Sequence, residues 1–240
     1  MKRIPALTLI FAVLSVVFIL LLIFFRFPFG LYPLISWQDA LDMLTPLVLI
    51  PVYWLLFKYA AGEAPSQAEE VAFMVLAALW VLGHGMHLAA NSIDNLSEAL
   101  ARQHVIDITA TGVYQLTYFF DERLSHVVWH LGIVGLAALL VAREARRPAE
   151  GAAATWVTVV VGVIYGILLF CIFIEGQTVA LGLPCMAALT LYGLMAGPRK
   201  VPQRPVLSFF FVAGALTLIA LAGWGLYWRG FPQFTDLGWI

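Results

Sequence analysis

Seven apolar runs recur along this chain of 240 residues. Each is roughly 20 residues long, the length at which a helix crosses the ~30 Å core of a bilayer. They lie near 5–26, 41–60, 70–92, 123–142, 154–174, 177–196 and 206–228. Hydrophobic residues make up 62% of the chain and charged residues 11%, against about 25% charged residues in a soluble domain. The sequence therefore predicts an all-α polytopic membrane protein with one domain, 1–240, of seven transmembrane helices.

The first apolar run differs from a cleavable signal peptide. It covers roughly 20 residues, whereas the apolar region of a signal peptide covers about 7–15, and no small-residue cleavage site follows it. We expect it to be retained as the first span. The net charge of −1 gives no indication of a nucleic-acid partner.

Basic residues favour one orientation of the seven spans. With the N-terminus in the cytoplasm, nine basic residues fall on the cytoplasmic side: Lys2, Arg3, Lys58, Arg143, Arg146, Arg147, Arg199, Lys200 and Arg204. Four fall on the other side: Arg26, Arg102, Arg123 and Arg229. The positive-inside rule therefore predicts a cytoplasmic N-terminus and an extracytoplasmic C-terminus, in what we expect to be a bacterial inner (plasma) membrane.

The connection 93–121, between the third and fourth spans, is the one long extramembrane segment. Connections longer than about 12–15 residues are usually functional or disordered. This one contains a plausible helical stretch near 95–105, then a β-branched and aromatic run, and is apolar enough to pack. We predict an extracytoplasmic cap over the mouth of the bundle; a disordered loop is the alternative. His104, within it, is expected to be an ordinary surface residue.

The other four histidines are the strongest functional signal. His84 and His87 lie on the third span, and His126 and His130 on the fourth, near the same end of the bundle. Imidazoles inside a bilayer normally face the bundle interior and mark a site. The two spans are antiparallel, so His84 falls at the depth of His130, and His87 at that of His126. We predict that all four converge on one centre in the outer leaflet.

Carboxylates and an amide accompany these histidines. Glu122 lies one helical turn before His126, and Glu175 closes the fifth span on the same side. Either is a candidate metal ligand or general base. Asn91, Asp94 and Asp121 are candidates to orient the imidazole N–H groups. Asp121 and Glu122 also suit a helix start, where acidic residues favour the first turn, and that alternative stays open.

Imidazole and carboxylate groups are the usual ligands of Zn²⁺ and non-haem Fe. Residues three or four apart on one helix are within chelating reach. We therefore predict a divalent transition metal, with Zn or non-haem Fe the first choices and Cu or haem b as alternatives. Two stacked haems would need ligands several turns apart, which the spacing here does not provide.

The sequence leads to an expected metal-dependent membrane enzyme, a hydrolase or an oxidoreductase, acting on a lipid or another apolar small molecule. The alternatives are a non-enzymatic metal- or haem-binding protein, and a small subunit of an oligomer or larger membrane complex. The inner halves of spans three to five are almost wholly apolar, which argues against a transport path through one protomer.

Small residues and cysteines complete the predictions. Gly83 and Gly85 would let another helix approach closely, and the GxxxG pair Gly162 and Gly166 is expected to be a packing contact. Cys171 and Cys185 lie near the outer ends of neighbouring spans, so a bridge between them is conceivable. Two unpaired core residues are the favoured reading.

The plan of seven spans with a histidine-rich centre near one face is broadly similar to alkaline ceramidases and adiponectin-receptor-type hydrolases, which carry an intramembrane zinc. Those proteins have an early Ser-x-x-x-His element and a His-x-x-x-His pair in the last span. Here HVVWH lies in the fourth span, and the sixth and seventh spans have no histidine. The resemblance is one of architecture, and it assigns no residue a role.

Overall fold

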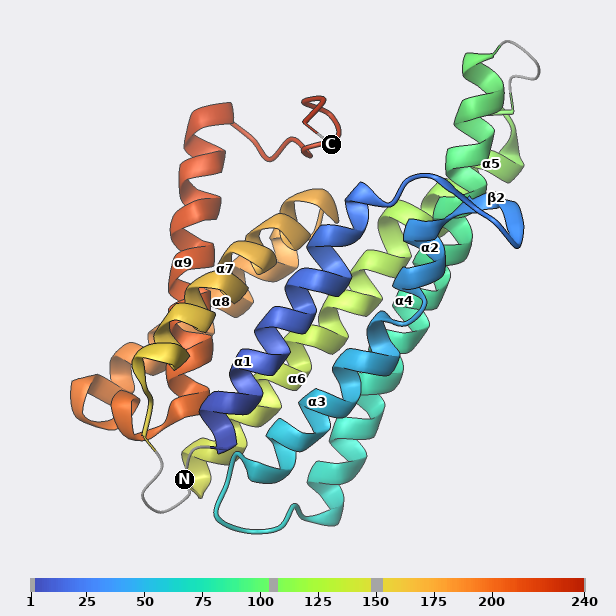
Figure 1. Cartoon of the computed structure of the whole chain (residues 1–240). Helices are drawn as coiled ribbons and strands as arrows, with labels where there is room; N and C mark the ends of the chain where they lie inside the picture. Colours follow the sequence, from blue (N-terminus) through green and yellow to red (C-terminus); the bar gives the residue numbers. More distant parts are fainter. Residues whose placement is uncertain (1–2, 104–107, 148–152, 240) are drawn as a thin grey trace.

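The computed structural model describes residues 3–103, 108–147 and 153–239, and these form a helical bundle (Figure 1). Seven helical units among them are long and apolar enough to cross a membrane. The predicted number of helices of membrane-spanning length is therefore confirmed. The helices are α1 (Arg3–Ser15), α2 (Trp37–Asp42), α3 (Thr45–Tyr59), α4 (Gln67–Arg102), α5 (Gly112–Tyr118), α6 (His126–Arg146), α7 (Trp156–Glu175), α8 (Val179–Lys200) and α9 (Pro205–Trp228).

Shorter helical turns extend or join these helices. The π-turn η1 (Val16–Leu20) and the 3₁₀ turn η2 (Leu21–Phe24) continue α1, the π-turn η3 (Phe119–Ser125) leads into α6, and the 3₁₀ turn η4 (Val201–Gln203) precedes α9. A small antiparallel hairpin of β1 (Pro28–Phe29) and β2 (Tyr32–Ser36) follows η2. The sequence did not predict this hairpin.

In its described part the segment 93–121 continues the neighbouring helices and forms no separate cap, and the helical stretch predicted near 95–105 is present as far as Arg102. The helix α4 continues to Arg102, and α5 and η3 run directly into α6, so that two helical arms rise beyond the rest of the bundle (Figure 1). A capping box between Ser66 and Glu69 starts α4, and no glycine or proline interrupts 92–102. The helix therefore has no local reason to end where its hydropathy falls. His104 lies outside the described residues.

Glycines bring α4 and α6 into direct backbone contact. A Cβ added to Gly83 would lie 2.4 Å from the Trp129 backbone nitrogen, and one added to Gly132 would lie 2.7 Å from that of Trp80. The expected close approach at Gly83 is confirmed. Gly85 faces open space, so the same expectation was wrong there. The crossing sets the two histidine pairs side by side.

A second close crossing joins α7 to α9. Added Cβ atoms on Gly162 and Gly166 would lie 2.9 Å from the Phe209 carbonyl and 2.7 Å from the Ala213 carbonyl. The GxxxG pair is thus a packing contact, as predicted.

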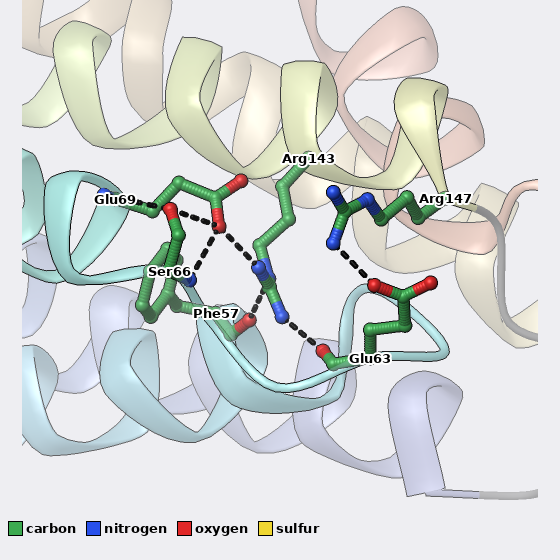
Figure 2. A network of polar contacts seen from close by, with 6 residues as sticks. All are labelled: Phe57, Glu63, Ser66, Glu69, Arg143 and Arg147. Carbon is green, nitrogen blue, oxygen red and sulfur yellow. Dashed lines mark hydrogen bonds and ion pairs between the residues drawn. The ribbon is translucent and has the colours of Figure 1, made fainter.

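The end of the bundle near the N-terminus, which we call the arginine end, is tied together by Arg143. Its guanidinium donates to the Phe57 carbonyl at 3.0 Å, to Glu69 Oε2 at 2.7 Å and to the Glu63 carbonyl. Figure 2 shows that Glu69 also accepts from Ser66 in the capping box of α4. Arg143 is 2% exposed and lies within α6, so it is a buried charge. The donors of a buried guanidinium need partners, and the ends of α3 and α4 supply them.

The next residue, Glu144, holds the start of α9. Its carboxylate accepts from the backbone N–H groups of Val206 and Leu207 at 3.0 and 2.7 Å. These are helix N-terminal donors without a partner inside the helix, and the helix dipole favours a negative charge there.

Candidate functional site

A cavity of about 1270 Å³ opens at the other end of the bundle, which we call the histidine end. Its walls come from η1, η2, the β1–β2 hairpin, α2, α4, α5, η3, α6, α7 and the segment 233–239 after α9. The residues of interest on its wall are His87, His126, His130, Glu122 and Glu175. The structure therefore brings three of the four predicted imidazoles and both predicted carboxylates to one cavity.

His87 is held by a carboxylate. Its Nδ1 lies 2.7 Å from Asp121 Oδ1, and Asp121 is fully buried. With Nδ1–H donating to this carboxylate, the Nε2 lone pair of His87 is free, and no hydrogen bond to it is found among the described residues. Asp121 thus contacts an imidazole nitrogen, the kind of contact predicted for it.

His130 is held in a similar way by a hydroxyl group. Its Nδ1 lies 2.6 Å from Thr178 Oγ1 at the start of α8. The ring of His126 lies between the other two, with centroids 4.7 Å from His87 and 5.7 Å from His130. His126 is 6% exposed, and its Nδ1 is buried without a partner in the described part of the chain. The three rings form a compact group, which we call the imidazole trio.

The π-turn η3 explains why Asp121 joins this group. In a π-turn the hydrogen bond runs from residue i to i+5, so residues five apart lie above one another. Asp121 and His126 are five residues apart, so Asp121 lies on the same side of the helix as His126. That side faces His87, which Asp121 contacts. Ser125 donates to the Asp121 carbonyl inside the same turn. π-Turns occur frequently at functional sites.

Gly176 leaves the space that the trio occupies. A Cβ at this position would lie 2.5 Å from His130 Cε1 and 3.4 Å from His126 Cγ. Carbon atoms in ordinary contact are about 3.5–4.0 Å apart. The tight turn between α7 and α8 therefore packs directly against the imidazole rings, and a side chain at this position would displace His130.

His84 does not share the centre predicted for all four histidines. Its Nε2 donates to the Asp42 carbonyl at 2.9 Å and lies 3.5 Å from Asp42 Oδ1. Trp129 packs edge-on against its ring at 4.7 Å. The second span is broken between Asp42 and Thr45, which leaves a carbonyl at the break to accept from His84. That acceptor attracts His84 away from the trio.

Both predicted carboxylates reach the cavity, and the chain after α9 contacts them. Glu175 Oε2 accepts from the Phe234 backbone N–H at 2.8 Å. The Gln233 side-chain amide donates to the Glu175 carbonyl at 2.5 Å and lies 3.4 Å from Glu122 Oε2. Glu175 therefore faces the cavity, with one of its oxygens already engaged.

The remaining predicted residues, Asn91 and Asp94, lie closer to the C-terminal end of α4 than His87. Asn91 accepts through its side-chain oxygen from Asn95 at 3.0 Å. Asp94 has a buried Oδ1 without a hydrogen-bond partner among the described residues. Both line the cavity, but neither is recorded in a hydrogen bond with an imidazole of the trio.

The arrangement is not a preformed metal cage. Within residues 3–103, 108–147 and 153–239, no three His, Cys, Asp or Glu side chains are positioned to hold an ion. Cys171 and Cys185 are unpaired, as favoured from the sequence. The site consists of three oriented or unpartnered imidazoles with two carboxylates on the same cavity wall.

Sequence reasoning missed Thr178, Gly176, Gln233 and Asp42. For Gly176 and Thr178 the only sequence signal is the short break EGQT after the fifth span, which places a glycine and a hydroxyl close to Glu175. The contacts of Gln233 and Asp42 depend on tertiary structure and leave no local pattern.

Comparisons with known proteins give no relative: no protein family, no curated protein and no solved structure matches this chain.

Proposed function

We propose that this chain is an integral membrane protein that binds one divalent transition metal through the imidazole trio and uses it to act on a lipid or another apolar substrate. Zn²⁺ and non-haem Fe²⁺ suit a donor set of imidazole and carboxylate. The observation that carries the proposal is the orientation of His87 and His130. Each uses Nδ1 for a hydrogen bond to Asp121 or Thr178 and keeps Nε2 for another partner.

This pattern is the usual second shell of a metal-bound histidine. A carboxylate or another acceptor fixes the tautomer and the ring orientation, and raises the basicity of the free nitrogen. The ring centroid of His126 lies 4.7 Å from that of His87 and 5.7 Å from that of His130, so the three imidazoles are close neighbours. Rotation of His126, which has an unpartnered nitrogen, would turn the trio into a ligand set.

The carboxylates supply the proton chemistry of the proposed enzyme. A metal in this position would polarise a carbonyl or activate a water molecule. Glu122 is the better candidate for general base, because within the described part of the chain its carboxylate has a single, long hydrogen bond of 3.4 Å, from Gln233. Glu175 has one oxygen bound to the Phe234 N–H, so its free oxygen suits a ligand or a substrate contact.

Elemental analysis with an optical spectrum tests the proposal on the full chain, purified in detergent without chelators. We expect about one equivalent of Zn or Fe, as for a mononuclear site. The metal should be lost in the double variant His87→Ala/His126→Ala. His84→Asn is the matched control: it lies on the same helix, but its imidazole contacts Asp42 instead of the trio. The control should keep its metal.

Other outcomes would overturn parts of the proposal. A Soret band that disappears in the double variant would assign a haem in place of a non-haem ion. Equal metal loss from His84→Asn and from the double variant would refute the trio as the ligand set. Wild-type protein that binds no added Zn or Fe would refute the metal centre altogether.

A further inference from the structure

The cavity at the histidine end has two chemically distinct walls. Apolar side chains come mainly from η1, η2 and α7: Ile19, Leu20, Leu22, Ile23, Leu168 and Ile172. Polar side chains come mainly from α2, α4, η3 and α6. Its volume of about 1270 Å³ exceeds the ~300–1,000 Å³ of ordinary small-molecule pockets. The space is thus suited to a ligand that has both a long apolar part and a polar part.

The apolar wall adjoins the surface that would face lipid. On η2, Leu22 and Ile23 face the cavity, while their neighbours Leu21 and Phe24 are 41% and 72% exposed. Large exposed apolar side chains on a membrane helix contact acyl chains. An alkyl chain could therefore pass from the bilayer to the cavity beside η2 while remaining among apolar groups.

The polar wall carries an excess of negative charge. Among the residues that the structure describes, seven carboxylates line the cavity: Asp39, Asp42, Asp94, Glu98, Glu122, Glu175 and Asp236. In the same part of the chain two arginines, Arg26 and Arg102, accompany them, and Arg102 is paired with Glu98 at 3.1 Å. The excess of five carboxylates favours a positively charged group and disfavours an anion.

Two buried polar atoms on this wall are available to a ligand. Asp94 Oδ1 and His126 Nδ1 are both buried, and neither has a hydrogen-bond partner in the described part of the chain. His126 is itself 94% removed from solvent, being 6% exposed, and it lines the cavity. Buried polar groups are normally satisfied, so a bound ligand or ion at this wall would complete their hydrogen bonding.

We propose that the cavity binds a single-chain amphiphile with a cationic head, of the alkylamine type. The chain lies along the wall of η2 and α7, and the ammonium group lies among the carboxylates of α4 and η3, next to the imidazole trio. This inference deepens the proposed function, on which it rests for the role of the ligand as substrate. Binding itself does not require the metal.

A displacement assay on the full chain in nanodiscs tests the inference. The probe is dodecylamine with a pyrene at the end of its chain, and the competitors are dodecylamine, dodecanol and dodecyl phosphate. We expect dodecylamine to displace the probe at concentrations at least about tenfold below those of dodecyl phosphate. The carboxylates on the wall attract the ammonium group and repel the phosphate group.

Two variants test the contributions of the polar wall and of the space for the alkyl chain separately. Asp94→Asn/Glu122→Gln should reduce the preference for the amine, because it lowers the excess of carboxylates on the wall from five to three, and should leave dodecanol displacement unchanged. Cys171→Trp, which places a large side chain in the cavity, should weaken all three competitors. Ile219→Trp is the control, because Ile219 is 70% exposed on α9 and is not part of the cavity wall. It should bind like wild type.

The assay is run after chelator treatment and again with added Zn²⁺. Displaceable amine binding in both conditions supports the inference, even if the protein holds no metal and the proposed function fails. Metal binding without displaceable amphiphile binding overturns this inference alone. Equal or tighter binding of the phosphate, or an amine preference that is undiminished in the double variant, would also overturn it.

Discussion

Replacing Gly176 with alanine tests whether the imidazole trio is packed as described. The backbone of Gly176 has φ −81° and ψ 9°, which alanine adopts without strain. The effect of the substitution is therefore steric. The new Cβ would lie 2.5 Å from His130 Cε1, about 1 Å inside the ordinary contact distance.

A shift of His130 by that amount would break its 2.6 Å hydrogen bond to Thr178. Loss of such a contact typically lowers metal affinity by about 10–100-fold. Overpacking of a filled site costs about 1–3 kcal/mol of stability. We expect Gly176→Ala to show both effects, measured by competition with a chelator of known affinity and by thermal unfolding of the metal-free protein.

Gly85→Ala is the control, since nothing lies within 4 Å of the added Cβ. Inside a helix this change should stabilise the protein by roughly 0.5–1 kcal/mol and leave metal affinity unchanged. The reasoning would be refuted if Gly176→Ala matched wild type in both metal affinity and unfolding temperature. If the two glycine variants behaved alike, the packing of the turn against His130 would be refuted as well.

Three further substitutions test other contacts. Thr178→Val should lower metal affinity about tenfold or more by removing the hydrogen-bond partner of His130, whereas Thr178→Ser should retain the affinity; chelator competition on both variants decides, and equal loss in both would contradict the role of the hydroxyl. Glu69→Gln should lower the free energy of unfolding by about 2–3 kcal/mol, because it leaves the Arg143 guanidinium buried without its carboxylate; this is somewhat less than the ~3–5 kcal/mol of a fully buried pair. Urea unfolding in mild detergent measures the loss, and an unchanged midpoint would contradict the network around Arg143. Gly83→Ala should destabilise the protein by about 1–3 kcal/mol, since its Cβ meets the α6 backbone and cannot be relieved by a side-chain rotation; thermal unfolding that equals that of wild type would show that α4 and α6 are not in backbone contact.

The number of helices was predictable because apolar length directly reflects membrane thickness. Their ends were less so. The third span was expected to end near residue 92, but α4 ends at Arg102. Hydropathy reports where a helix leaves the apolar region, whereas helix termination needs a breaker or a cap, and 92–102 contains neither a glycine nor a proline.

The candidate site was predictable where it depended on regular helix geometry. The side-by-side placement of His87 and His126 followed from depth counting on antiparallel helices, and the rings lie 4.7 Å apart. The position of Asp121 was open, because the π-turn that aims it at His87 has no sequence signature. His84 was misplaced because its acceptor, the Asp42 carbonyl, comes from an irregular break in another helix.

The length of α4 has a consequence for where reactions at this site would occur. Its 36 residues span about 54 Å at ~1.5 Å per residue, well beyond the ~30 Å of hydrocarbon. His87 stands 20 residues after Gln67, where the helix begins, and therefore about 30 Å along its axis. In a bilayer whose one interface lies at the start of α4, the imidazoles would lie level with the headgroups of the opposite leaflet. An amphiphile could then present its polar bond to the site without leaving the membrane, and water would have only a short path to the same atoms.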